Sequence, residues 1–312
     1  MQLIRDSIDL SEFMGDAEPD HAVNPASHWL DGVIDHFYKP AEAPLTRLGW
    51  RKTHADFQFR SGEVTLWAGI NGHGKSQMVG QVALDLMLQS ERVCMASLEM
   101  HPVRTMARMA RQAHGSDEPP RRYLQQFATW TDDKLWLYEH VGSCAPAVML
   151  AVIRYAVSKF GVTHFIVDNL MKIVAGEDAY NEQKDFVNGL CTIAHDTGVH
   201  IHLVLHVKKG KDEHDVPGKF AIKGSGAITD LVDNVFIVWR NKAKEAAIRA
   251  GGDNDPDNPD ALLCLEKQRN GEAEGRYGFW FDRHSMQYLE SRLDHPKMLR
   301  VEREITAQEV EF

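Results

Sequence analysis

The sequence has no run of 18 apolar residues, and this excludes a membrane-spanning helix of the usual kind. Residues 1–6 also lack the apolar stretch of a signal peptide. Cysteine is scarce, and the four that occur are far apart, which suits buried, reduced thiols better than disulfides or a metal site. They are Cys94, Cys144, Cys191 and Cys264. We therefore expect a cytoplasmic protein that makes no contact with a membrane.

Positive charge is in deficit as well. The chain has 35 lysines and arginines against 45 acidic residues, and its net charge is −10. This balance argues against a protein coated in nucleic acid, although a local basic groove remains possible. The sixteen histidines show no H-x-x-x-H spacing on a plausible helix, and the cysteines show no C-x-x-C. We therefore do not expect a metal site built from them.

The clearest feature that is present is a phosphate loop. Residues 69–76 fit the pattern G-x-x-x-x-G-K-[ST] without a gap, between a β-rich run and helically spaced apolar residues. In such a loop, backbone N–H groups and the helix N-terminus face phosphate oxygens. The lysine reaches the β- and γ-phosphates, and the serine hydroxyl holds Mg²⁺. We therefore expect ATP or another nucleoside triphosphate, with Mg²⁺, at Gly69, Asn71, Gly72, His73, Gly74, Lys75, Ser76 and Gln77.

The order of predicted elements indicates the fold class. From Phe57 onward, strands and helices alternate, which predicts an α/β fold with a mostly parallel, twisted sheet flanked by helices. We assign residues 46–312 to this domain. Residues 1–45 are expected to form a short arm with one amphipathic helix at residues 27–38, for which Ser27 is a plausible N-cap. The pattern does not decide whether this helix packs on its own domain or on a neighbouring subunit.

Three polar residues stand where apolar strands end. Asp168 ends the run at residues 165–167, the Walker B pattern in which a carboxylate positions Mg²⁺ and its water. Glu99 ends the strand after the phosphate-loop helix, where a carboxylate can orient or deprotonate the attacking water. His206 ends a third apolar strand. Because ligands of open α/β sheets bind at the carboxyl ends of strands, we expect all three beside the phosphate loop, with Asp168 and Ser76 as the metal-binding pair.

Taken together, these residues resemble the DnaB-type replicative helicases, which have a RecA-like ATPase core. The resemblance covers about residues 46–289. Beyond the phosphate loop, the family's S-L-E-M and Walker B strand have counterparts at residues 97–100 and 165–168. Its R-G-S-G-A-I and K-Q-R-N-G have counterparts at residues 223–228 and 267–271. The resemblance implies a RecA-like P-loop NTPase that hydrolyses ATP to translocate on single-stranded DNA and unwind the duplex.

The resemblance also implies roles for individual residues and partners. Glu99 becomes the catalytic base, His206 senses the γ-phosphate, and Lys267 and Arg269 reach the γ-phosphate bound by the adjacent subunit. Such a shared site implies a ring of identical subunits, which we expect to be a hexamer. Primase, polymerase or a helicase loader are further possible partners.

A basic loop follows His206. Residues 208–223 contain five lysines and three acidic residues, a local charge of +2 in a chain of −10. In the family, this loop faces the central channel and contacts the backbone of the single strand, and modest basic loops repeated around a ring can suffice. A solvated loop is the alternative. The candidate DNA-binding residues are Lys208, Lys209, Lys211, Lys219 and Lys223.

Departures from the family refine the hypothesis. His206 stands where most DnaB proteins have Gln, and Lys223 replaces the usual Arg. About 45 preceding residues cannot hold the family's N-terminal helical domain or a primase domain. We therefore expect a stripped, phage or Twinkle-like member, which would act in the bacterial host cytosol if phage-encoded. A RecA-like recombination ATPase, a DnaB-like ATPase for packaging or repair, and a non-motor protein whose assembly on DNA is gated by ATP remain alternatives.

Overall fold

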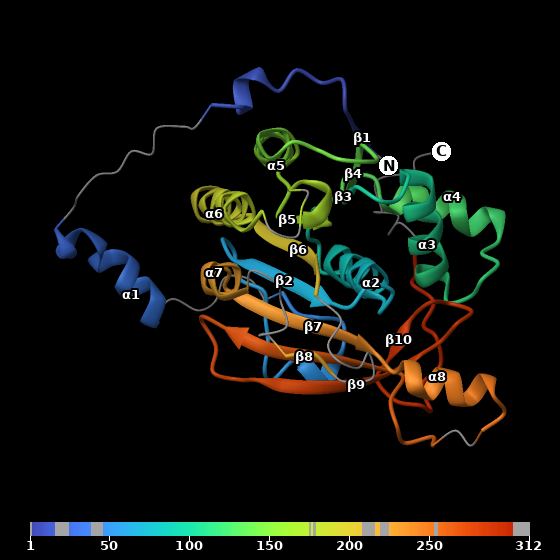
Figure 1. Cartoon of the computed structure of the whole chain (residues 1–312). Coiled ribbons are helices and arrows are strands. Elements are labelled where there is room, and N and C mark those ends of the chain that lie inside the picture. The colour runs from blue at the N-terminus through green and yellow to red at the C-terminus, as the bar shows by residue number, and fades with distance from the viewer. Residues whose placement is uncertain are drawn as a thin grey trace.

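The computed structural model describes residues 2–15, 25–38, 46–174, 176, 179–207, 216–218, 225–252 and 255–301. Within these ranges, ten strands form one twisted sheet in the order β1-β4-β3-β5-β6-β2-β7-β8-β9-β10 (Figure 1). The strands are β1 Gln2–Arg5, β2 Val64–Gly69, β3 Val93–Ser97, β4 Leu135–Glu139, β5 His164–Asp168, β6 His200–His206, β7 Asn234–Arg240, β8 Ala261–Gln268, β9 Gly275–Phe281 and β10 Tyr288–Leu289.

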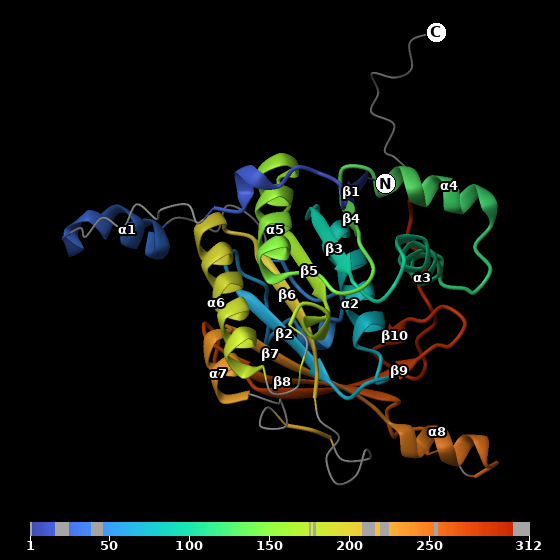
Figure 2. The same ribbon diagram turned by 45° about the horizontal axis from the view of Figure 1, so that its top comes forward.

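Eight α-helices accompany the sheet in the part of the chain that the structure describes. They are α1 Leu30–Tyr38, α2 Lys75–Leu88, α3 Pro102–His114, α4 Arg121–Trp130, α5 Pro146–Phe160, α6 Tyr180–Thr197, α7 Ser225–Leu231 and α8 Lys242–Arg249. Figure 2 shows α5 and α6 together over one face of the sheet, with α3 and α4 grouped elsewhere. None of the described helices is both long and apolar enough to span a bilayer.

The sheet is mostly parallel, as the sequence predicts. β1 to β7 all run parallel to one another, whereas the pairs β7–β8, β8–β9 and β9–β10 are antiparallel. Successive side chains of a strand point to opposite faces. In β2, Leu66 and Ala68 join the core under α5 and α6, while Trp67 joins the core under α2 and α3. Helices thus cover both faces of the sheet. Because the parallel strands run in the same direction, their carboxyl ends lie at one edge, where the phosphate loop lies.

Most predicted elements are confirmed within a few residues, and two were missed. Helices α5 and α6 end at Gly161 and Gly198, and both glycines adopt the left-handed conformation. The sequence pattern does not predict β1, which pairs with β4 at the edge of the sheet. Nor does it predict α8, which begins after Asn241, whose side chain accepts a hydrogen bond from the backbone N–H of Lys244.

The helix expected in the arm is confirmed as α1. Ser27 is not its N-cap, because a 3-10 turn, Ala26–Trp29, precedes α1 and places Ser27 inside that turn. Apolar side chains of α1 are exposed: Val33 is 49% and Phe37 is 72% exposed. Figure 1 shows α1 apart from the sheet and its covering helices.

Candidate functional site

The phosphate loop turns sharply between β2 and α2. Gly74, the residue before α2, has φ of 84°, a left-handed conformation that side chains rarely adopt. A Cβ atom there would also overlap the hydroxyl of Tyr288. That hydroxyl donates to the carbonyl of Gly74 at 3.3 Å. Only glycine therefore fits here. The hydrogen bond from Tyr288 of β10 connects the β9–β10 hairpin to the loop.

Lys75 is folded back into the loop. Its Nζ donates to the carbonyls of Gly69 at 2.9 Å and Ile70 at 3.0 Å, and the residue is only 4% exposed. Burial lowers the pKa of Lys75 to about 8, while the negative charges of Asp168 and Glu99 oppose this fall. Its ammonium is thus mostly protonated at neutral pH and lies where β- and γ-phosphates of a nucleotide would be neutralised.

Asp168 lies beside Ser76, as the sequence predicts. Burial raises the pKa of Asp168, whereas the hydrogen bond from Ser76 and the charge of Arg108 oppose this rise. The hydroxyl of Ser97, opposite Asp168 in the β3–β5 pairing, is buried and has no hydrogen-bond partner among the described residues.

These residues fit Mg²⁺ better than a metal held by the protein alone. The described residues contain no group of three or more His, Cys, Asp or Glu side chains that could enclose a metal ion. Mg²⁺ needs no such group, because it keeps waters and binds one or two carboxylates together with substrate phosphates. The Ser76 hydroxyl and the Asp168 carboxylate supply that minimal set.

Glu99 and His206 are joined by a residue that the sequence reasoning missed. The side-chain amide of Asn169 donates to Oε1 of Glu99 at 2.9 Å and to Nε2 of His206 at 2.9 Å. Asn169 is fully buried. Its position directly after Asp168 at a strand end is the signal that could have revealed it.

This contact fixes the tautomer of His206. Because Nε2 accepts from Asn169, the proton of the neutral ring is on Nδ1, and this atom has no partner among the described residues. Burial, followed by the charge of Lys75, lowers the pKa of His206, so the ring is neutral at pH 7. At the end of β6, beside a candidate base, an N–H group is therefore left without an acceptor among the described residues.

Beside His73, a predicted nucleotide-binding residue, lie two residues that the sequence did not indicate, Arg240 and Phe281. His73 is 1% exposed, and its Nδ1 accepts from the backbone N–H of Arg240 at 3.1 Å. The guanidinium of Arg240 lies 5.0 Å from the centre of the Phe281 ring. These two flat groups border the loop, and flat surfaces of this kind can bind a nucleobase.

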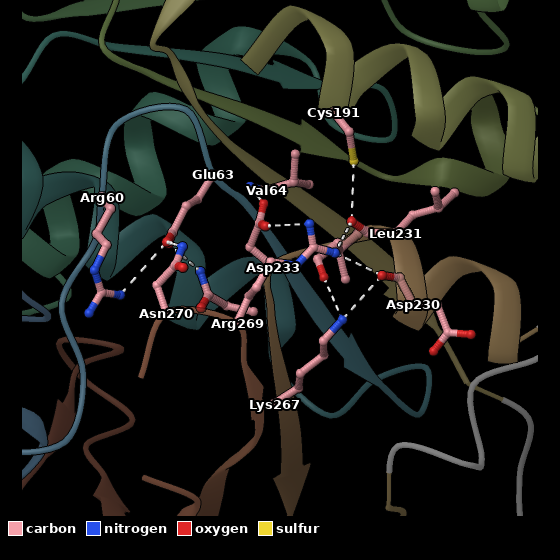
Figure 3. Close-up of polar contacts among 12 residues, drawn as sticks. Arg60, Glu63, Val64, Cys191, Asp230, Leu231, Asp233, Lys267, Arg269 and Asn270 are labelled. Carbon is pink, nitrogen blue, oxygen red and sulfur yellow. Dashed lines mark hydrogen bonds and ion pairs between the residues drawn. The ribbon is translucent and has the colours of Figure 1, made fainter. Parts of the chain in front are cut away.

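Lys267 and Arg269 lie away from the phosphate loop, at the end of α7. Lys267 Nζ donates to the carbonyls of Thr229 and Val232 at 2.6 and 2.8 Å. Arg269 Nη2 donates to the carbonyls of Asp230 and Leu231 at 2.8 and 2.9 Å (Figure 3). Both cations thus satisfy carbonyl groups at the C-terminal end of α7, where positive charge is favourable.

Their distance from the loop of the same chain follows from the topology. Arg269 Nη1 pairs with Asp233 at 3.2 Å, and the other carboxylate oxygen of Asp233 accepts from the backbone of Val64, the first residue of β2. At 3.3 Å per residue, β2 extends roughly 16 Å from Val64 to its last residue, and Lys75 lies beyond that residue. The structure therefore does not bring Lys267 and Arg269 to Lys75 of the same chain.

The five candidate DNA-binding lysines cannot be placed. Lys208, Lys209, Lys211, Lys219 and Lys223 lie outside the described residues. The residues before them are described: Val207, after the end of β6, donates to the carbonyl of Gly69 at 3.0 Å. The residue before the basic segment is thereby held at the start of the phosphate loop.

Comparison with known proteins supports this picture of the core. Residues 54–212 match the model of a family described as AAA domain. Among solved structures, the ATPase domain of G40P is 14% identical, with a TM-score of 0.72 over 86% of this chain and 99% of that one. A DnaB-like replicative helicase, solved to show its interactions with primase, is 13% identical, with a TM-score of 0.69 over 85% and 68%. At these identities the matches establish the fold: a mostly parallel sheet flanked by helices, as in DnaB-like ATPase domains.

Proposed function

The chain belongs to the AAA domain family, and from that premise we propose that it is an ATP-dependent replicative DNA helicase of the DnaB type. It would hydrolyse a nucleoside triphosphate to translocate on single-stranded DNA and part the duplex. One observation carries the proposal: Asn169 links a candidate base, Glu99, to a candidate phosphate sensor, His206, beside Lys75. Through Asn169, a change at Glu99 during hydrolysis would be transmitted to His206.

The hydrolysis step needs few residues. Glu99 accepts a proton from the attacking water, and Asn169 holds its carboxylate by a hydrogen bond. Lys75 neutralises the phosphate charge that develops as the bond to the γ-phosphate breaks. Ser76 and Asp168 would hold Mg²⁺, which supplies charge stabilisation on the phosphate oxygens.

The same residues would couple ATP hydrolysis to translocation on DNA. The free Nδ1–H of His206 is available to a γ-phosphate oxygen, and the next residue along the chain, Val207, bonds to Gly69 of the loop. Release of phosphate would remove the partner of His206 at the start of the basic segment, residues 208–223. We propose that this segment holds single-stranded DNA through its lysines.

Two features support the proposal that the chain assembles with copies of itself. The exposed apolar side chains of α1 would be covered by a neighbouring subunit. Lys267 and Arg269 lie far from Lys75 of their own chain, and Arg269 is 49% exposed, so a neighbour's phosphates are their most direct nucleotide target. We propose a ring of identical subunits in which each site is completed in trans. The interaction of the DnaB-like structure with primase makes primase a candidate partner here too.

A strand-displacement assay tests the proposal. The wild-type protein, with ATP and Mg²⁺, should release a labelled strand from a forked duplex, and Glu99→Gln should not. Hydrolysis stimulated by single-stranded DNA without strand release would instead favour packaging or repair. ATP-dependent DNA binding without turnover would favour a non-motor protein.

A further inference from the structure

A cavity lies beside the phosphate-loop helix α2, and Lys75, Asp168 and Glu99 do not line it. It has a volume of about 340 Å³. Its walls come from α2, the end of α3, residues 49–50 and the segment between residues 287 and 300. Trp50 and Leu84, each 3% exposed, form part of its apolar wall. We call this cavity the α2 pocket.

Two residues that line the α2 pocket each carry a buried hydrogen-bond acceptor with no donor among the described residues. The carboxylate of Asp85, on α2, accepts from the backbone N–H of Gly49, but within the described part of the chain its Oδ2 is buried without a partner. Gln112 is 1% exposed; its amide donates to the carbonyls of Gln77 and Met286, each at 2.9 Å. Its Oε1 is also buried without a partner among the described residues. A buried acceptor is unfavourable until a donor reaches it.

The charges around the pocket favour a cation. Three acidic residues, Asp85, Glu290 and Asp294, line it against two basic ones, Lys297 and Arg300. Burial raises the pKa of Asp85 to about 7; Lys297 opposes this rise, and Glu290 adds to it. The carboxylate therefore has both its protonated and its charged form near neutral pH, and a bound cation would favour the charged form.

We propose that the α2 pocket is a binding site for a small organic cation with an apolar or aromatic body, of the amidine or guanidine class. Its N–H groups donate to Asp85 and Gln112, and its body packs against Trp50 and Leu84. A neutral molecule of the same shape leaves the charge of Asp85 without a partner, and an anion is repelled by it.

The pocket is connected to the phosphate loop through β10. Tyr288 also lines the pocket; its backbone carbonyl accepts from Nε1 of Trp50 at 2.9 Å, and its backbone N–H donates to Gln81 of α2 at 2.7 Å. Its hydroxyl donates to Gly74. A ligand that displaces Trp50 or Tyr288 therefore changes the support of the loop, and we expect it to change the KM for ATP.

Calorimetric titration of the full chain tests the proposal with three probes of one shape. Benzamidine is a cation, benzamide is neutral and benzoate is an anion. We expect benzamidine to bind at least about tenfold more tightly than benzamide, the range for one charge-assisted hydrogen bond. Benzoate should not bind. Benzamidine affinity should rise between pH 6 and pH 8, as Asp85 ionises.

Two variants locate the site. Asp85→Asn should lower benzamidine affinity by about 10- to 100-fold, because it removes the charge while keeping the shape. Asp294→Asn, another acidic residue of the pocket, should change it by less than about threefold, as for a screened pair. The proposal is overturned if benzamidine and benzamide bind equally, if nothing binds at millimolar concentrations, or if the affinity of Asp85→Asn equals that of the wild type. The comparison of probes on the wild type stands even if Asp85→Asn does not fold.

Discussion

The indole N–H of Trp67 donates to Nδ1 of His202 at 3.2 Å, in the middle of the sheet. Nε2 of His202 must therefore carry its ring proton, which it donates to Nδ1 of His164 at 3.0 Å. A third histidine, His200, contacts the carbonyl of Arg60 and the hydroxyl of Thr65 at 2.7 and 2.8 Å. All three rings are buried, and Nε2 of His164 lies 3.8 Å from Oε2 of Glu91.

This histidine cluster predicts a steep loss of stability in acid. Burial lowers the pKa of His200 to about 4, and it lowers those of His164 and His202 well below 6.5. Below pH 6.5 the unfolded chain binds more protons than the folded one. The contribution of the neutral rings to the free energy of unfolding is therefore fully present above pH 6.5. It falls as pH drops toward 4, by up to about 1.4 kcal/mol per pH unit for each histidine.

Urea unfolding at pH 7.5 and pH 5.5 checks this expectation. Replacing His202 with Gln, which does not titrate, should reduce the difference between the two midpoints. His195→Gln, at a side chain that is 88% exposed, is the matched control and should leave it unchanged. Equal wild-type stability at both pH values would contradict the argument.

The second prediction concerns hydrolysis. Lys75→Ala should abolish turnover and weaken nucleotide binding, because it removes the cation at the phosphates. Glu99→Gln should keep nucleotide binding and lower kcat by roughly 10²–10⁴, the range for loss of a general base. Phosphate release and binding of a fluorescent nucleotide measure the two effects. Glu139→Gln, at the exposed end of β4, is the control. Turnover by Glu99→Gln within a few fold of wild type would remove Glu99 from the base role.

The third prediction tests whether sites are shared between subunits. Arg269→Ala should bind nucleotide, because its own phosphate loop is intact, but should hydrolyse about 10³–10⁵-fold more slowly. Lys75→Ala alone should also be inactive. A mixture of the two should recover activity wherever an intact loop faces an intact Arg269. Arg276→Ala, at an exposed residue of β9, controls for loss of surface charge. No recovery, when the subunits demonstrably exchange, would argue against a shared site.

The fourth prediction concerns the lysines outside the described residues. If Lys208, Lys209 and Lys211 contact phosphates, replacing all three with Ala should flatten the slope of log affinity for single-stranded DNA against log salt. The change should be about 2, at ~0.7 per phosphate contact. Fluorescence anisotropy at several salt concentrations measures it, with Lys159→Ala combined with Lys184→Ala as the control. The ATPase rate without DNA should stay the same. An unaltered slope would indicate that the DNA binds to other residues.

The sequence predicted the residues that stand at fixed places in the topology. Asp168 and Ser76 meet because a parallel sheet brings strand ends to one edge, and this could be read from apolar runs alone. The strand end marks the position of Asn169, but its two contacts could not be predicted, since they depend on side chains 70 and 37 residues away. β1 was missed because it is a strand only through its pairing with β4. Lys267 and Arg269 lie against α7 because β8 pairs antiparallel with β7, and local sequence patterns do not reveal this pairing.

The attachment of Lys267 and Arg269 to α7 has a consequence for timing. A guanidinium that bonds the carbonyls of Asp230 and Leu231 cannot at the same moment reach a phosphate in another subunit. The two destinations compete, so occupancy of one subunit's nucleotide site would release the last turn of α7 in the next. Because α7 follows directly on the basic segment, exchange of its amide hydrogens with solvent would report the nucleotide state of a neighbour.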